Sequence, residues 1–350
     1  MNIPADQLTA LAISILGHAG ATPDAAHKIA TRLVNANLTG HDSHGVGMIP
    51  AYVEGILAGQ LITDAQATVV QDKGPFLLVD GQQGFGHIVA EQAMEMVIDR
   101  AKASHFAVLS LRNSFHLGRL GDWGAMAAEA GFICILYANV QSSRPIVAPF
   151  GGSDPRFVTN PYCTAIPATE KHPMFLLDMA TSTIAMGKAR VADLSGKQVP
   201  EGAVIDAEGR GTTDPSVMFS EPSGSLTTFG GHKGFGLALL GDILGGSFSG
   251  GGAYSPEREV PSQIINNMMA ILIDPNVFGA AEAFGVDMDK YTDWVKASPP
   301  APGFEAVQMP GDPERRCSES RQENGIFVDP GTLSQLMETA KNAGVPQAEI

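Results

Sequence analysis

The sequence is poor in cysteine and in basic residues, and each shortage argues against a class of protein. Its three cysteines, Cys134, Cys163 and Cys317, are an odd number without CxxC spacing, so a disulfide framework and a cysteine-based zinc site are not expected. Lysine and arginine total 22 against 37 aspartate and glutamate residues, a net charge of −15. Such a charge argues against nucleic-acid binding. Any acidic substrate would need a local cationic pocket.

Several sequence signatures are also missing. No basic segment precedes a short apolar run at the N-terminus, and no run of about 18 apolar residues occurs, so we expect a cytoplasmic protein. There is no GxGxxG fingerprint, because Gly84-Phe85-Gly86 and Gly234-Phe235-Gly236 each lack the third glycine. Walker A, HExxH and GxSxG sequences are absent as well. A dinucleotide enzyme with this sequence must therefore use a scaffold other than the Rossmann fold.

The remaining composition is that of a globular protein. Hydrophobic residues make up 44% and charged residues 17% of the 350 residues, which allows two or three packed units with a sizeable core. Helical spacing predicts a first helix around Leu8–Leu16 and a second that Thr22 caps and Gly40 ends. The polar segment His41–Gly45 then lies in a loop, because the apolar stripe resumes at Ile49.

From about residue 65 onward, short apolar runs alternate with helical stretches. This alternation predicts an α/β fold with a central sheet covered by helices. The expected strands are 76–79, 108–111, 133–136, 175–177 and 269–273, and the expected helices are 90–102 and 235–245. Residues 296–330 are rich in proline and charge and predict an extended arm before a last helix, Thr332–Asn342.

We therefore divide the chain into three parts. Residues 1–64 form a helical N-terminal subdomain that packs with residues 280–350. Residues 65–279 form the α/β core that binds cofactor and substrate, and residues 280–350 form a C-terminal arm and helix.

A polar loop containing His116 and Arg119 follows the expected strand 108–111. Polar residues just beyond a strand's carboxyl end are where α/β proteins place their sites. A histidine there can exchange a proton with a substrate hydroxyl near neutral pH, and the arginine can bind a carboxylate through two parallel hydrogen bonds. The alternative is a solvated histidine beside a structural arginine, and spacing alone slightly favours it.

The dense polar segment His41–His44 admits a metal interpretation. Histidines at i and i+3 beside a carboxylate, with His116 or His232 as further ligands, can hold a metal ion. None of the usual zinc spacings is present, so we expect no metal. Otherwise Asp42 is a helix cap and both histidines are ordinary loop residues.

Two further segments fit a phosphate or ribose group. Asp178 ends an expected strand and is followed by Thr181 and Ser182, a junction that offers free N–H groups to an anion and an acid to a ribose hydroxyl. Lys233 lies in a glycine loop near the start of an apolar helix, where the helix dipole disfavours a cation. The alternative for the Asp178 junction is an ordinary strand-to-helix cap, and the alternative for Lys233 is a solvent-facing lysine.

Taken together, these segments resemble one family, the malate/L-lactate dehydrogenases with a non-Rossmann fold. Within it the sequence is most similar to the hydroxycarboxylate dehydrogenase B branch, which shares GHDSHGxGMIP and HxGRxGxW. The resemblance implies a mixed central sheet flanked by helices, with a helical N- and C-terminal subdomain. The matching stretches are GHDSHGVGMIPAYV (40–53), RNSFHLGRLGDW (112–123), APFGG (148–152), TNPYCTAIP (159–167), LDMATSTIAMGKAR (177–190), GGHKGFGLALLGDILGGSFSGG (230–251) and MPGDPERR (309–316).

The resemblance also implies roles for single residues. His116 corresponds to the proton donor and acceptor, and Ser43 and His44 to the loop that faces substrate and nicotinamide. The implied cofactor is NAD or NADP, and the implied assembly is a homodimer with the site near the subunit interface. The residues implied to contact the cofactor are His44, Gly118, Thr159, Asn160, Asp178, Met179, Ala180, His232, Lys233, Gly311 and Glu314.

One position departs from the family pattern. Most members carry an arginine four residues after the second histidine of HDSHG, where it binds the substrate carboxylate, but this chain has Met48. Another cation must bind the carboxylate, and Arg119 and Arg144 are the candidates. Met48 leaves room for a bulkier or more apolar substrate.

The resulting prediction is an NAD(P)-dependent oxidoreductase that interconverts a small 2-oxo acid and its 2-hydroxy acid, with His116 as general acid/base. A reductase of a cyclic imino acid on the same scaffold is the first alternative. A metal-dependent hydrolase using His41, His44 and His116 is a remote one, and a catalytically silent binding protein is another.

Overall fold

Seven strands form the central sheet of the computed structural model, which describes residues 1–141, 144–255 and 264–346. The strand order is β2-β3-β4-β11-β5-β6-β7. Only the β3–β4 pair is parallel, and the other neighbours are antiparallel. The sheet is therefore mixed, which confirms the expected fold class. The bounds are β2 Thr68–Lys73, β3 Phe76–Asp80, β4 Phe106–Ser114, β5 Ile133–Gln141, β6 Tyr162–Ile166, β7 Phe175–Met179 and β11 Ile265–Ile273.

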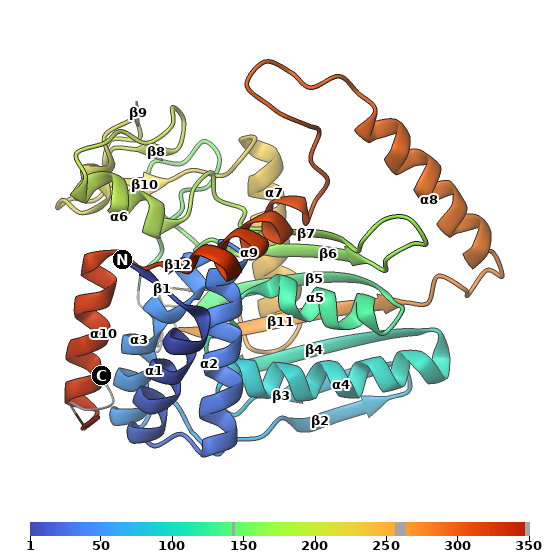
Figure 1. Ribbon diagram of the computed structural model, residues 1–350, viewed down its shortest axis with the longest axis horizontal. Helices are drawn as coiled ribbons and strands as arrows, with labels where there is room; N and C mark the ends of the chain where they lie inside the picture. Colours follow the sequence, from blue (N-terminus) through green and yellow to red (C-terminus); the bar gives the residue numbers. More distant parts are fainter. Residues whose placement is uncertain (142–143, 256–263, 347–350) are drawn as a thin grey trace.

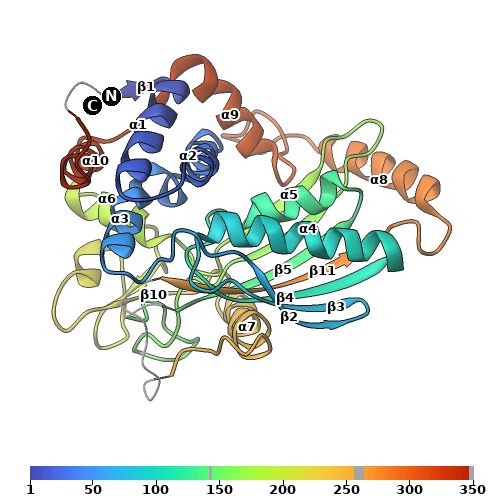
Figure 2. The same cartoon turned by 90° about the horizontal axis from the view of Figure 1, so that it is seen from below.

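Helices cover both faces of this sheet (Figure 2). Helices α4 (Gly86–Ser104) and α5 (Leu120–Glu129) lie on one face, and α7 (His232–Leu240) with the π-helix η4 (Gly241–Ser247) lies on the other. Small residues and branched aliphatics of α4, including Val89, Ala90 and Ala93, are fully buried. Helices thus cover the apolar side chains on both faces of the sheet and remove them from water.

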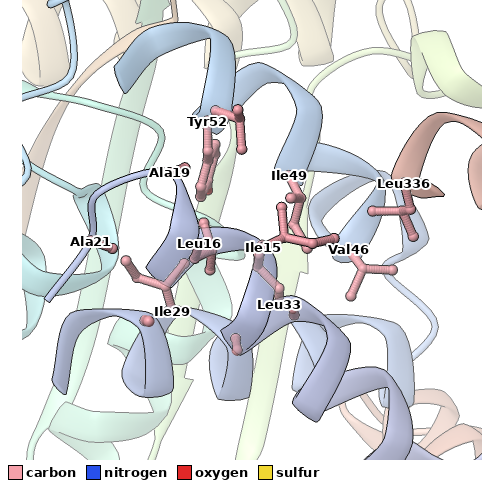
Figure 3. Close-up of a cluster of buried hydrophobic side chains, with 14 of the residues drawn as sticks. Ile15, Leu16, Ala19, Ala21, Ile29, Leu33, Val46, Ile49, Tyr52 and Leu336 are labelled. Carbon is pink, nitrogen blue, oxygen red and sulfur yellow. The ribbon is translucent and has the colours of Figure 1, made fainter. Parts of the chain in front are cut away.

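A second core lies beside the sheet, among the N-terminal helices α1 (Ala5–His18), α2 (Pro23–Leu38) and α3 (Ile49–Leu57) (Figures 1 and 3). Thr22 accepts a hydrogen bond from the Ala25 N–H at 3.3 Å and so starts α2. The C-terminal helix α10 (Pro330–Asn342) adds Leu336 to the same cluster. Strands β1 (Asn2–Ile3) and β12 (Ile326–Phe327) pair antiparallel and hold the two ends of the chain together.

Residues from the segment 184–226 form most of a third, smaller apolar cluster. This region contains α6 (Met186–Leu194), the 3₁₀ turn η3 (Pro215–Met218) and a three-stranded sheet of β10, β8 and β9. Its strands are β8 Val204–Ile205, β9 Gly211–Thr212 and β10 Ser225–Leu226. Because Phe157 and Val147 belong to the same cluster, the unit is anchored to the chain segment between β5 and β6.

The structure differs from expectation in the segment 296–330, where an extended arm was predicted. Helix α9 (Asp312–Asn324) interrupts it, following α8 (Ala281–Lys296). None of the α9 residues is buried, so no apolar stripe marks this helix in the sequence. Its start signals are Gly311, with φ of 94°, and Pro313 in the first turn. Among the described helices, none has both the length and the apolar character needed to cross a membrane.

Candidate active site

Seven segments that are distant in the sequence meet around a cavity of about 480 Å³. They are the loop before and within the 3₁₀ turn η1 (Asp42–His44), the loop from β4 to α5, the end of β5, the loop before β6, the segment from the end of β7 into α6, the start of β11, and the first turns of α9. Many of the predicted site residues line the cavity. These are Ser43, His44, His116, Gly118, Arg119, Thr159, Asp178, Met179, Ala180 and Glu314.

His116 lies in the loop beyond β4, and its side chain is only 8% exposed. Its Nδ1 lies 2.8 Å from the hydroxyl of Tyr52 on α3. Nε2 is therefore the ring nitrogen that remains for a ligand in the cavity. Burial, reinforced by the charges of His44 and His87, lowers the pKa of His116 well below 6.5. The ring is accordingly neutral at physiological pH when no ligand is bound.

A second imidazole lies directly beside this one. The rings of His44 and His116 stack with centroids 5.4 Å apart and planes 17° apart. Ser43 Oγ is 3.1 Å from Nδ1 of His44. Burial, followed by the charges of His41 and Arg119, lowers the pKa of His44 to about 4. Two neutral imidazoles thus face the cavity, and protonating either one disfavours protonating the other.

Two cationic side chains of the described residues line the cavity, Arg119 and Lys188. Arg119 precedes α5 and donates from Nε to Asp122 Oδ1 at 2.8 Å, with both side chains 9% exposed. This buried ion pair is what the alternative of a structural arginine predicts. Lys188, in the first turn of α6, was not singled out from the sequence. The signal that drew attention to Lys233, a cation placed against a helix dipole, applies to it equally.

Two acids complete the cavity wall. Asp178, at the end of β7, accepts a hydrogen bond from the Gly121 N–H at 2.8 Å, and burial raises its pKa. A Cβ on Gly121 would lie 2.7 Å from Asp178 Oδ2, so this approach requires glycine. Glu314 Oε1 lies 3.5 Å from His41 Nε2, and the hydrogen bond from His41 lowers the pKa of Glu314.

Two features of this wall fit a nicotinamide dinucleotide. Glu314 Oε2 is buried without a hydrogen-bond partner, and a ribose hydroxyl is a donor that would satisfy it. Gly118, with φ of 72°, brings backbone rather than side chain to the cavity wall.

Other predicted residues lie outside the cavity lining. Met48 packs against the N-terminal core. Arg144 is half-exposed, hydrogen-bonds to Ser223 and lies 3.9 Å from Glu221.

The rest of the predicted cofactor contacts are also not part of this lining. Asn160 is buried, and it donates to the Ala238 carbonyl at 3.0 Å and to Asp242 at 2.8 Å. His232 and Lys233 are exposed in the first turn of α7. Gly311 is the residue immediately before α9.

Sequence reasoning missed several polar residues of the site. Asn266 lines the cavity, and its Oδ1 accepts a hydrogen bond from the Leu117 N–H at 2.9 Å, which fixes the loop beside His116. Tyr52 was noticed only within a matching stretch. Neither residue carries a local signal, because one sits in an apolar strand and the other in an apolar helix stripe.

The metal interpretation finds no support in the described part of the chain. There, no group of three or more histidine, cysteine, aspartate or glutamate side chains could hold a metal ion. Asp42, a ligand in that hypothesis, instead binds Arg321 at 2.6 and 3.0 Å and Asn37 at 2.7 Å.

Comparison with known proteins identifies the family of this chain. Residues 3–337 match the malate/L-lactate dehydrogenase family model. Hydroxycarboxylate dehydrogenase B of Escherichia coli O157:H7 is 41% identical over 95% of this chain and 91% of its own length. L-lactate dehydrogenase of Cupriavidus necator is 35% identical over 99% of this chain and 100% of its own.

Solved structures show the same relationship. A candidate malate/lactate dehydrogenase of E. coli superposes with a TM-score of 0.94 at 38% identity, covering 99% of this chain and 97% of that one. Delta1-piperideine-2-carboxylate reductase of Pseudomonas syringae superposes with a TM-score of 0.81 at 26% identity, covering 97% and 100%. The chain belongs to the malate/L-lactate dehydrogenase family of oxidoreductases.

Proposed function

We propose that this protein interconverts a small 2-oxo acid and its 2-hydroxy acid with NAD or NADP, and that His116 is the general acid/base. The observation that carries the proposal is the His116 ring, which is buried beside the cavity with Nδ1 bound to Tyr52 and Nε2 left for a ligand. The family, whose relatives are named for hydroxycarboxylate, lactate and malate oxidation, supports the reaction class.

The proton step follows from the charge states of the site. When bound, the cofactor supplies the hydride for reduction and accepts it in oxidation. In oxidation, neutral His116 takes the substrate hydroxyl proton on Nε2 and becomes an imidazolium. In reduction, the imidazolium returns that proton to the carbonyl oxygen. Since a nearby anion favours the charged ring, the substrate carboxylate itself raises the low pKa of His116 toward the working range.

The substrate carboxylate is held by Arg119 or Lys188, the cations at the cavity. Burying an unpaired carboxylate is costly, and Met48 supplies no charge. Arg119 shares its charge with Asp122 at 2.8 Å, whereas Lys188 forms no ion pair with an acid of the described residues. Arg144 remains a predicted candidate that the cavity lining does not include.

Binding of the cofactor is assigned to other residues of the same cavity. They are Gly118, Thr159, Asp178–Ala180 and Glu314. His44 and Ser43 adjoin the reacting atoms, beside His116. Asn160, His232, Lys233 and Gly311 stay predicted contacts.

The test compares two neighbouring histidines. We expect His116→Ala to lower kcat by roughly 10²–10⁴-fold, the usual contribution of such a group, while quenching of NADH or NADPH fluorescence still reports cofactor binding. His44→Ala is the matched control, because it removes the stacked ring but leaves the proton donor. Near-normal turnover of His116→Ala with loss of activity in His44→Ala would assign the proton transfer to His44 instead.

A second candidate function is reduction of the C=N bond of a cyclic imino acid. The superposition with a delta1-piperideine-2-carboxylate reductase favours it, since both substrate classes place a carboxylate next to the reacting double bond. Steady-state kcat/KM values for a panel of 2-oxo acids and for a cyclic imine, each with NADH and NADPH, separate the two functions and define the cofactor preference.

We also propose a homodimer. Helix α8 projects from the edge of the molecule (Figure 1), and large apolar side chains are exposed on it and beside it. Large apolar side chains exposed together often mark interaction sites. The residues are Phe278, Tyr291, Trp294 and Phe304.

A further inference from the structure

Tyr52 carries a single polar group into an otherwise apolar core. Its side chain is fully buried, on α3, among the aliphatic residues of the N-terminal cluster (Figure 3). The ring packs edge-on against Phe115 with centroids 5.3 Å apart and lies 6.2 Å from Phe85. A phenylalanine would fill the same space. The hydroxyl is therefore not explained by packing.

The hydroxyl is explained by its contact with His116. Its oxygen lies 2.8 Å from Nδ1 of the His116 ring. Burying a hydroxyl without a partner is unfavourable, so this bond offsets the cost of placing the hydroxyl in the core. Conversely, the α3 backbone and the surrounding aromatic rings fix the hydroxyl, so the bond also fixes the orientation of the imidazole.

We propose that Tyr52 is a positioning residue that holds the His116 ring with Nε2 toward the cavity and favours its protonated form. This inference rests on the proposed function of His116. Tyr52 touches neither substrate nor cofactor in it and acts only through the histidine.

The preference for the protonated ring follows from the chemistry of a hydroxyl. Burial raises the pKa of Tyr52, so the phenol keeps its proton. Toward a neutral ring the hydroxyl donates to a bare Nδ1 or accepts from an Nδ1–H. Toward an imidazolium it accepts from Nδ1–H, and this charge-assisted bond is roughly twice as strong as a neutral one. Tyr52 therefore stabilises the state that forms during oxidation and that starts reduction.

The other groups facing His116 act in the opposite direction. His44 of η1 stacks on the ring, and His87 of α4 approaches it edge-on at 6.4 Å. A charge on either one lowers the pKa of His116, as burial does. His87 is 2% exposed, and burial lowers its own pKa to about 3. Among the described side chains that contact the ring, Tyr52 is thus the one that favours a proton on it.

The experiment uses Tyr52→Phe, which keeps the aromatic ring and removes only the hydroxyl. Tyr162→Phe is the matched control, because its hydroxyl also makes one hydrogen bond, to Thr164 at 2.6 Å on β6. Two readouts are compared with wild type: the pH profiles of kcat in both directions, and the ¹⁵N signals of the His116 ring in the free enzyme between pH 8 and pH 4.

We expect the His116 pKa to fall by on the order of one unit in Tyr52→Phe. The part of each kcat–pH profile that reflects protonation of His116 then moves to lower pH, for oxidation and for reduction. At neutral pH the reduction slows about tenfold, more than the oxidation does, because reduction starts from the imidazolium. Tyr162→Phe should match wild type in both readouts.

Other outcomes would overturn the proposal. An activity loss without any movement of this part of the profile or of the ¹⁵N titration would show that the hydroxyl is merely structural. A His116 titration that moves to higher pH in Tyr52→Phe also counts against it. If Tyr52→Phe does not fold, 3-fluorotyrosine at position 52 keeps the size and hydroxyl but weakens the acceptor, and it should shift the titration in the same direction.

The two proposals fail separately. Full activity of His116→Ala removes the proposed function, whatever the ¹⁵N titration shows. An unchanged titration in Tyr52→Phe removes only the role of Tyr52, with His116→Ala still inactive.

Discussion

At the scale of single residues, positive charge is scarce at the cavity, where a substrate carboxylate would need it. The molecule carries a net charge of −15, and the cavity has two described cationic side chains, Arg119 and Lys188. Arg119 is buried and forms an ion pair with Asp122, whereas Lys188 is exposed on α6. The two cations can therefore have different roles: one neutralises acids of the cavity lining, and the other binds the substrate carboxylate.

We expect Arg119→Met to lower kcat/KM for a 2-oxo acid by about 10²-fold, since breaking one side of a buried charge pair leaves Asp122 uncompensated. Lys188→Met should raise KM by about tenfold, because an exposed cation is screened by solvent. Arg144→Met is the control and should keep wild-type values. If Arg144→Met alone raises KM, the carboxylate is bound outside the cavity described here.

His87 contributes a pH dependence of stability. Burial lowers its pKa from 6.5 to about 3, so the unfolded chain binds a proton that the folded chain excludes. Stability is therefore full above pH 6.5 and is lost as the pH falls toward 3. Between pH 6 and pH 4 this group alone contributes a loss of about 1.4 kcal/mol per pH unit.

The measurement is urea unfolding of wild type and His87→Asn at several pH values in that range. The variant should show the shallower decline in unfolding free energy, whatever its absolute stability. Equal slopes in the two proteins would mean that His87 is protonated in the folded state or solvated there.

At the scale of elements, helix α9 is held by polar contacts rather than by a core. None of its residues is buried, yet it brings Pro313, Glu314 and Cys317 to the cavity. Arg321 anchors it by binding both oxygens of Asp42, the first residue of η1, and the Asn37 carbonyl of α2. One bidentate contact thus links α9 to the loop that carries Ser43 and His44.

We expect Arg321→Ala to raise the Kd for the cofactor about three- to tenfold. Without the arginine, α9 samples positions away from the cavity, and the entropy lost when the helix becomes ordered reduces the binding free energy. The fluorescence titration that measures Kd should show no change for Arg316→Ala, which removes the same charge from an exposed position on the same helix. Equal effects of both variants would indicate a general electrostatic effect instead.

Local signals account for some elements and not for others. Thr22 and Pro23 mark the start of α2, and alternation of apolar runs marks the strands of the sheet. Helix α9 escaped prediction because its stabilising contacts are with distant residues, Asp42 and Met174 among them. A helix without a buried face leaves no period in its sequence, since the period reflects burial.

At the scale of the whole molecule, the exposed aromatic residues of α8 predict self-association. Tyr291 and Trp294 stack with centroids 6.1 Å apart, and Trp294 is 73% exposed. We expect a dimer in analytical ultracentrifugation, and Trp294→Ala should weaken it at least tenfold, because buried tryptophans dominate interface energies. Leu194→Ala, at an exposed position on α6, is the control. A monomeric wild type would exclude the dimer.

The sequence by itself determined what depends on local pattern. It indicated the α/β class, the absence of a Rossmann fingerprint, and the polar loops that carry His44, His116 and Asp178, because periodicity, capping and turn chemistry are properties of neighbouring residues. The malate/L-lactate dehydrogenase resemblance, which the comparisons confirm, rested on seven such segments in order.

Only the tertiary structure decided which polar groups meet. Tyr52 and His116 are 64 positions apart and lie 2.8 Å from each other, and Lys188 reaches the cavity that Met48 does not line. The pairing of Arg119 with Asp122, three residues away, was likewise decided by the fold. Contacts of this kind depend on how helices and the sheet pack, and packing is set by the summed burial of the whole core rather than by any single segment.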